Sequence, residues 1–236
     1  MSPSSPPAKL TTTTQIPWNS LMAVIMFFCF YYPIGLYNNA VPTHAVALRG
    51  FQFFLLVWQF LLFTSSFTAM MIAGIPDAET GGNIANLLFS LSLIFCGVLQ
   101  TPQALPGFWI FMYRVSPFTY LVEGMLSTAV ANQRVTCAAN EYVTFQPPAG
   151  QTCQAYMAPY ISTAGGYLED PNATTDCNFC TYESTNVFLT GVSASYSHYW
   201  RDFGILWVYI IFNICAAVMI YWLARVPKKQ GKQKKE

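Results

Sequence analysis

The chain has 236 residues, of which 54% are hydrophobic and only 9% are charged, and its formal net charge is +1. Soluble domains carry about 25% charged residues, so this composition excludes an ordinary soluble domain. A net charge this close to zero gives no electrostatic field that would attract nucleic acid, and we expect no nucleic-acid partner.

Four stretches of the chain contain no Asp, Glu, Lys or Arg, and they hold almost all of the aliphatic and aromatic side chains. They cover residues 10–48, 50–76, 80–113 and 203–224. A bilayer core of about 30 Å needs about 20 consecutive apolar residues in a helix, and a charge buried there is costly. The sequence therefore predicts an all-α, polytopic membrane protein that is surrounded by the lipid bilayer.

Four membrane-spanning helices are expected within these stretches, at about residues 16–37, 51–75, 83–99 and 203–224. Pro17 suits the start of the first helix, where its missing N–H does no harm, and Pro33 is expected to end or kink that helix. Residues 1–15 are rich in Pro, Ser and Thr. We interpret them as a flexible lead-in or as the remnant of a truncated chain.

Residues 104–131 hold two apolar runs that are interrupted by Arg114, Pro117 and Glu123. Runs of about 10 to 12 residues are too short to cross a bilayer, so we expect a re-entrant helical hairpin. Arg114 and Glu123 lie on either side of Pro117, and an ion pair between them would hold the hairpin folded. The alternative for these two charges is a part in transport.

Residues 132–202 form a polar loop that contains four of the seven cysteines. Oxidising surroundings outside the cell favour disulfides over the zinc or redox chemistry that Cys177-x-x-Cys180 would otherwise indicate. Four cysteines allow three pairings, which the sequence alone does not separate. In a compact loop, pairing Cys153 with Cys177 and Cys137 with Cys180 closes the two nested loops most economically. We expect structural disulfides here and no metal site.

The distribution of basic residues predicts the orientation in the membrane. Residues 225–236 carry six of the eleven Lys and Arg, and such a cluster directly after a span marks the cytoplasmic side. Four crossings then leave both termini in the cytoplasm and the polar loop outside. Asn172, in the acceptor sequence Asn-Ala-Thr, is accordingly expected to be glycosylated. The link that carries Asp77 and Glu79 would be cytoplasmic without a basic residue, but acidic residues count little in this rule.

The sequence contains no recognisable catalytic constellation. It has no Gly-x-Ser-x-Gly, no His-Glu-x-x-His and no Gly-x-x-x-x-Gly-Lys-[Ser/Thr] run, which excludes an ATP site of this kind on the chain. Its two histidines, His44 and His198, lie outside the expected spans, where a solvated or interfacial role is favoured over metal ligation or proton transfer. We expect no catalytic residue and no cofactor on this chain.

Two runs of sequence carry a specific resemblance. SPFTYLVEGM lies in the expected hairpin, NATTDCNFC lies in the polar loop, and the third span ends in FCGVL. In this order of features, the chain resembles the C-terminal part of the second transmembrane domain of a fungal pleiotropic drug resistance transporter, an ABCG-type ABC transporter. The resemblance covers nearly all of residues 15–235 and implies the last four of the six helices of an ABC-2 type transmembrane domain. It implies that ATP and Mg²⁺ would bind to a nucleotide-binding domain that is not on this chain.

The resemblance also implies site residues. In that family, hydrophobic drugs, sterols or lipids leave through a cavity that the helix matching the third span partly lines. Val98 and Leu99 match an apolar plug between cavity and exit, and a dry constriction of branched side chains can gate without charge. Four residues fall on the cavity-facing side one to two turns earlier: Phe89, Ser90, Leu93 and Ile94. The alternative is that these residues only pack helices together.

The function implied by the resemblance is that of a transmembrane fragment of an ATP-driven exporter of hydrophobic drugs, sterols or lipids. The fragment would form part of the translocation pathway in the plasma membrane. Its partners would be hydrophobic small molecules together with the remaining helices and nucleotide-binding domains of the transporter. The alternative is a regulatory membrane protein without a motor domain, which would pair with an intact half-transporter. A membrane-embedded enzyme has no residues to support it.

Overall fold

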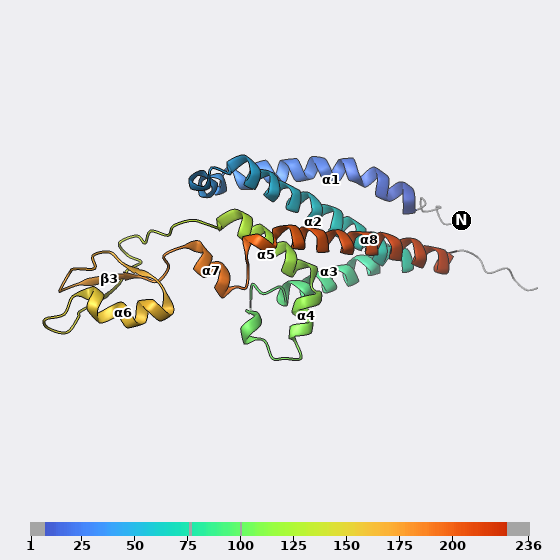
Figure 1. Cartoon of the computed structure of the whole chain (residues 1–236). Helices are drawn as coiled ribbons and strands as arrows, with labels where there is room; N and C mark the ends of the chain where they lie inside the picture. Colours follow the sequence, from blue (N-terminus) through green and yellow to red (C-terminus); the bar gives the residue numbers. More distant parts are fainter. Residues whose placement is uncertain (1–7, 76, 100, 226–236) are drawn as a thin grey trace, which may run out of the picture.

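The computed structural model describes residues 8–75, 77–99 and 101–225, and in these residues it is mostly helical. Four long helices run side by side in alternating directions (Figure 1). They are α1 (Ala8–Tyr31), α2 (Val46–Gly74), α3 (Ala78–Ile94) and α8 (Tyr199–Arg225). Helix α2 packs against each of the other three. The predicted all-α membrane class is therefore confirmed.

Two of these helices are long and apolar enough to cross a membrane by themselves, at Val46–Gly74 and Tyr196–Leu223. A third candidate is bent: Gln15–Tyr31 is followed at 79° by η1 (Leu36–Thr43), a 3₁₀ helix. Helix α3 has 17 residues and is about 26 Å long, which is shorter than a bilayer core of about 30 Å. The predicted span at residues 83–99 was therefore too long at its end, because the helix stops at Ile94.

The first helix differs from the prediction at its start. It begins at Ala8, so Pro17 lies inside it, and residues 8–15 are helical where a flexible lead-in was expected. Proline removes one backbone hydrogen bond, and the helix formers Ala, Lys and Leu precede it here. Residues 1–7 lie outside the described part of the chain. The other end agrees with the prediction, since α1 ends at Tyr31, before Pro33.

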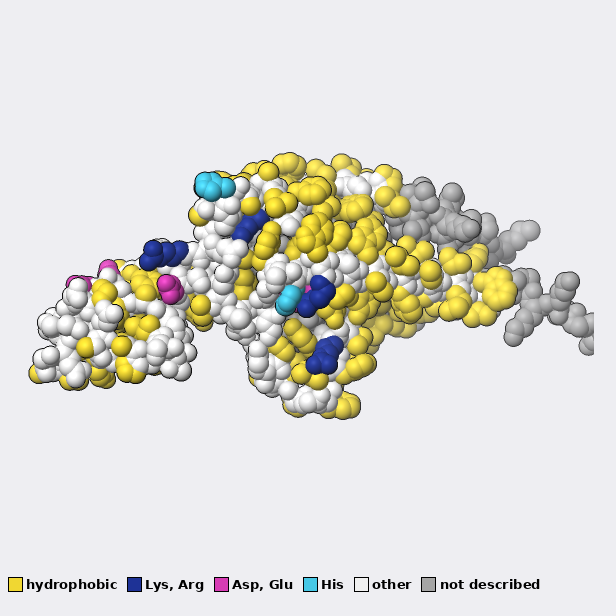
Figure 2. All heavy atoms as spheres, in the orientation of Figure 1, with side chains coloured by type: hydrophobic (Ala, Val, Ile, Leu, Met, Phe, Trp, Pro, Cys, Tyr) yellow, Lys and Arg dark blue, Asp and Glu magenta, His cyan; other side chains and the backbone are white. Residues whose placement is uncertain are grey.

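The apolar core of the bundle has two parts that meet on α2. Leu56 and Phe63 of α2 pack with Leu206 and Ile210 of α8. On the other side, a second cluster joins α1 and α2, and its buried members are Ala23, Phe27, Tyr31, Phe53 and Val57. Large apolar side chains also cover the outside of the bundle, where Figure 2 shows few charged groups. This exposed apolar surface is what a bilayer requires of a membrane domain.

The predicted hairpin is a pair of short helices, α4 (Ile110–Val115) and α5 (Pro117–Val130), preceded by the 3₁₀ turn η2 (Pro102–Ala104). The two helices are separate because Pro117 has no backbone N–H to continue the hydrogen bonds of α4. Three hydroxyl groups donate to the carbonyl oxygens freed at the end of α4: Thr119 to Tyr113 at 2.8 Å, Tyr120 to Arg114 at 2.8 Å and Tyr209 to Val115 at 2.8 Å. The break therefore leaves these polar backbone atoms satisfied.

The polar loop folds into a small lobe at the end of the bundle opposite to the start of α1 and the end of α8 (Figure 1). Three short strands, β1 (Val143–Phe145), β2 (Tyr167–Leu168) and β3 (Cys177–Cys180), form an antiparallel sheet in the order β1-β3-β2. Beside it lie α6 (Cys153–Ala164) and α7 (Thr185–Gly191), and the 3₁₀ turn η3 (Tyr196–His198) leads into α8. This sheet was not predicted from the sequence.

Two disulfides join the elements of the lobe. Cys137 pairs with Cys180 and Cys153 with Cys177, which is the nested arrangement. The second bond lies in the small core of the lobe with Leu168 and Phe179. The other three cysteines are free thiols: Cys29, Cys96 and Cys215.

Candidate functional site

Helix α3 presents an open face on which three of the expected cavity residues lie. Ser90 is exposed, Leu93 is 48% exposed and Ile94 is 50% exposed. The Ser90 hydroxyl donates to the Asn86 carbonyl oxygen one turn back at 2.9 Å, so the side chain offers no unsatisfied donor. This face is mostly apolar and can contact an apolar molecule without the cost of desolvating polar groups.

Phe89 lies at the edge of that face and turns into the protein. Its ring centroid is 4.9 Å from that of Phe67 on α2 and 5.8 Å from that of Phe118 on α5. The structure thus divides the four expected cavity residues into three open positions and one packing position. Phe89 supports the wall from behind, because it joins the core cluster that holds α3 against α2 and α5.

The segment after α3 places the expected plug residues on the surface. Gly97 has a φ of +91°, and a Cβ there would lie 2.9 Å from the Tyr113 ring, so this turn favours glycine for two reasons. Phe95 stacks on Trp109 with centroids 5.1 Å apart and anchors the segment to the residues before α4. Beyond the turn, Val98 is 66% and Leu99 is 74% exposed. Two branched side chains therefore stand free just past the end of the open face.

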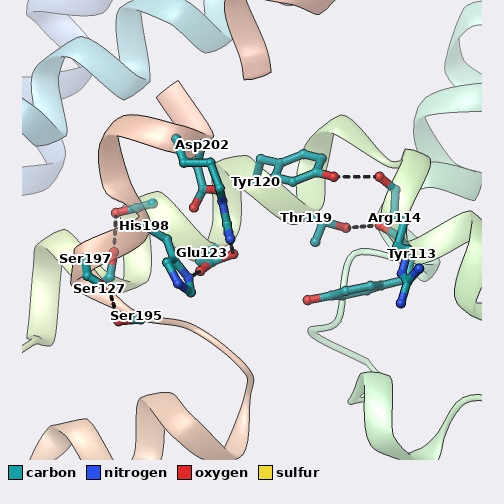
Figure 3. Close-up of polar contacts among 12 residues, drawn as sticks. Tyr113, Arg114, Thr119, Tyr120, Glu123, Ser127, Ser195, Ser197, His198 and Asp202 are labelled. Carbon is teal, nitrogen blue, oxygen red and sulfur yellow. Dashed lines mark hydrogen bonds and ion pairs between the residues drawn. The ribbon is translucent and has the colours of Figure 1, made fainter. Parts of the chain in front are cut away.

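A partly buried polar cluster joins the hairpin to the last helix, and it is drawn in Figure 3. Glu123 of α5, whose side chain is 9% exposed, contacts His198 Nδ1 at 2.7 Å and Arg201 at 3.1 Å. Arg201 also binds Asp202 at 2.9 Å, and Asp202 is fully buried. Among the described residues, its Oδ2 has no hydrogen-bond partner. The cluster links α5, η3 and the first turn of α8.

The predicted ion pair between Arg114 and Glu123 is wrong. Helix α5 turns Glu123 towards α8, whereas Arg114 lies in the last turn of α4, on the other side of the break, and points away in Figure 3. Glu123 is instead held by His198 and Arg201, which follow it by more than 70 residues in the chain. His198 consequently has a structural partner, in addition to the interfacial position that was expected for it.

A second polar anchor, which was not predicted from the sequence, is Arg49 at the start of α2. It is 2% exposed, donates to the Ala131 carbonyl oxygen at 2.7 Å and lies 5.2 Å over the Tyr196 ring. Ala131 caps the C-terminus of α5, where a helix carries partial negative charge, so a cation is stabilised there. The signal was present, since Arg49 is the single charge that separates residues 10–48 from 50–76.

Comparisons with known proteins agree with this architecture. The family model of the ABC-2 type transporter matches residues 2–130, which is more than half of the chain, and that of the CDR ABC transporter matches residues 184–235. The chain belongs to the ABC-2 type transporter family. The resemblance to a fungal ABC transporter that was predicted from the sequence is confirmed.

Several fungal relatives are similar to this ABC-2 region at high identity. ABC multidrug transporter C of Aspergillus fumigatus is 66% identical over 221 residues, which cover 94% of this chain and 15% of that protein. ABC-type transporter oblD of Aspergillus clavatus is 63% identical over 214 residues, covering 91% of this chain and 15% of that protein. ABC-type transporter eriD of Hericium erinaceus is 58% identical over 217 residues, with the same two shares. The chain thus spans about one seventh of the length of these relatives.

Proposed function

We propose that this chain forms part of the translocation pathway of an ATP-driven exporter of hydrophobic drugs, sterols or lipids. ATP and Mg²⁺ would act on nucleotide-binding domains outside this chain, and the remaining transmembrane helices would complete the cavity. The relative from Aspergillus fumigatus is named as a multidrug transporter, which supports the drug class of cargo. The chain itself would supply no catalytic residue.

The observation that carries this proposal is the open face of α3 followed by Val98 and Leu99. One side of α3 packs against α2 and α5, and the other leaves Ser90, Leu93 and Ile94 exposed. In an assembled transporter this face would form a cavity wall. Val98 and Leu99 would meet their counterparts from the other half and close the exit as a dry gate.

The test is a full-length transporter that contains this membrane region. Ser90→Phe should narrow the cavity and shift which drugs are exported, and Leu99→Ala should loosen the gate and raise basal ATP hydrolysis by about two- to fivefold, a gating effect of less than about 1 kcal/mol. Ser162→Phe is the matched control for the first variant, since Ser162 is exposed on α6 and also donates to a carbonyl oxygen of its own helix. Leu223→Ala, at a leucine of α8 that is 63% exposed, is the control for the second.

If Ser90→Phe and Leu99→Ala both leave drug resistance profiles and basal ATP hydrolysis unchanged at equal surface expression, the proposal is contradicted. These residues would then only pack helices together. The same result would favour a regulatory role for the chain over a pathway role.

We further propose that the lobe lies outside the cell, that both termini are cytoplasmic and that the protein resides in the plasma membrane. The disulfides of the lobe support this orientation, because such bonds persist in oxidising compartments. Asn172 lies in an exposed turn that a glycan could occupy. Deglycosylation should increase gel mobility in the wild type and leave Asn172→Gln unchanged. If the wild-type protein carries no glycan and its lobe is protected from external protease, the orientation is the opposite of the one proposed.

A further inference from the structure

A pocket of about 180 Å³ lies between α1, α2 and α8, away from the open face of α3. Its polar residues are Gln15 and Asn19 of α1 with Ser65 and Ser66 of α2. Its walls are apolar and include the indole rings of Trp58 and Trp207. Among the described residues that line it, none is charged, so the pocket suits a neutral molecule.

The polar side of this pocket offers one donor and one acceptor next to each other. Asn19 Nδ2 donates to Ser65 Oγ at 2.7 Å and to the Leu61 carbonyl oxygen at 3.4 Å. A carbonyl oxygen can only accept, which fixes the orientation of the Asn19 amide. Within the described part of the chain, Asn19 Oδ1 then accepts no hydrogen bond and the Ser65 hydroxyl donates none. A hydroxyl group both donates and accepts, and it matches this pair.

The apolar side of the pocket suits a ring. The Trp58 and Trp207 centroids are 6.0 Å apart at an interplanar angle of 67°. Trp58 Nε1 donates to Ser20 Oγ at 3.0 Å, so its polar group is already used and its ring acts as an apolar wall. An engineered apolar cavity of about 150 Å³ in another protein binds benzene, so this volume holds one six-membered ring. A larger molecule would extend out of the pocket past Ile16, which is 45% exposed.

We propose that this pocket binds the hydroxyl-bearing ring of a membrane sterol. The sterol enters from the bilayer, places its hydroxyl between Asn19 and Ser65 and its first ring beside Trp58 and Trp207, and leaves its remaining rings in lipid. It is a resident lipid between α1, α2 and α8, distinct from any cargo that contacts α3. The inference does not rest on the proposed transport function.

The test measures energy transfer from tryptophan to dehydroergosterol, a fluorescent sterol, with the full 236-residue chain in phosphatidylcholine nanodiscs. Transfer should saturate with sterol, and Trp207→Phe should lower it much more than Trp222→Phe, which alters an exposed residue outside the pocket. The 3-O-methyl ether of the same sterol lacks the donor and should bind about tenfold more weakly, as expected for one lost hydrogen bond. This comparison changes only the ligand, so it is independent of the folding of any variant.

Side-chain variants locate the hydroxyl contact. Ser65→Ala keeps the Asn19 contact to the Leu61 carbonyl and should weaken sterol binding about tenfold. Ser162→Ala, at an exposed serine of α6 that also donates to a carbonyl oxygen of its own helix, is the matched control and should bind as the wild type does. Non-saturable transfer to the wild type, equal binding of the alcohol and its ether, or wild-type binding in Ser65→Ala with loss of binding in Ser162→Ala would each overturn the proposal.

Discussion

The helical bundle and the outer lobe of this chain are held together in different ways. The bundle packs the other three long helices against α2, and its outer surface carries large apolar side chains, with Val208 66% and Phe212 63% exposed. The lobe has few buried apolar residues, a three-stranded sheet and two disulfides. Small domains with little core need covalent links, whereas a bundle in lipid is stabilised by packing and satisfied backbone groups. The bundle, which faces lipid, and the lobe, which has a polar surface, are thus stabilised by different interactions within one chain.

The largest expected effect is the loss of a disulfide, which should destabilise the lobe and leave the bundle intact. Removing the Cys153–Cys177 link, with Cys153→Ser and Cys177→Ser together, should destabilise the lobe by about 3 to 4 kcal/mol, because it frees a loop with a sequence separation of 24 residues. The lobe should become sensitive to protease while the α2 and α8 segments stay protected in the membrane. Cys29→Ser, at a free thiol in α1, is the control. Equal loss of protection in both regions would mean that the bundle depends on the lobe.

The second prediction weakens the bundle near the lobe through Arg49. Arg49→Met keeps the apolar stem but loses the charged hydrogen bond to the Ala131 carbonyl and the contact with Tyr196. We expect a loss of about 2 to 3 kcal/mol in thermal or denaturant unfolding. Arg134→Met changes an exposed arginine and should alter stability little. Similar values for the two variants would show that Arg49 contributes no more than a surface charge.

The third prediction tests the junction between the two regions. Glu123→Gln removes the charge that faces His198 and Arg201, whose side chains are 44% and 50% exposed. Solvent screening of those partners limits the expected loss to about 1 to 2 kcal/mol. Arg114→Gln should be nearly neutral, because Arg114 does not reach Glu123. If Arg114→Gln cost as much as Glu123→Gln, the pairing drawn in Figure 3 would be contradicted.

The smallest effect lies at the end of the bundle farthest from the lobe. The Asp77 carboxylate caps α3 by accepting from the Thr80 N–H at 3.0 Å and the Thr80 hydroxyl at 2.6 Å, and these bonds lower the pKa of Asp77. The cap therefore stabilises α3 fully above the ordinary pKa of an aspartate, and its contribution is lost as pH falls through the lower folded-state pKa. The protection factors of the amides in the first turn of α3, which are corrected for the intrinsic pH dependence of exchange, should fall on acidification in the wild type. Asp77→Asn keeps a capping oxygen and should remove this pH dependence.

The sequence predicted the parts of the fold that composition determines. Charge-free stretches located α2 and α8, since lipid selects against charge over the whole length of a span. It was less accurate where a short turn decides the end of a helix, as at Gly97 after α3 and Pro17 within α1. Proline and glycine mark such points, but packing determines which side of them stays helical.

Pairings across long sequence separations were the part that the sequence could not determine. Arg114 is nine residues from Glu123 and was the local choice, but the helix break turns Glu123 towards α8 and its partners at His198 and Arg201. The split of Phe89 from Ser90 likewise depends on which neighbour fills the space behind α3. The nested disulfides were one of three possibilities until the sheet brought Cys177 and Cys180 onto one strand.

The break between α4 and α5 restricts how the length of this region can vary. Three carbonyl oxygens at the end of α4 are each met by a hydroxyl, two from α5 and one from α8. Inserting or deleting one residue between Tyr113 and Tyr120 would rotate α5 by about 100° and move its hydroxyls off their acceptors. Substitutions that keep a hydroxyl are compatible with the hairpin, whereas a change of one residue in length leaves polar backbone exposed at membrane depth. The hairpin therefore requires a fixed spacing of Tyr113, Thr119 and Tyr120.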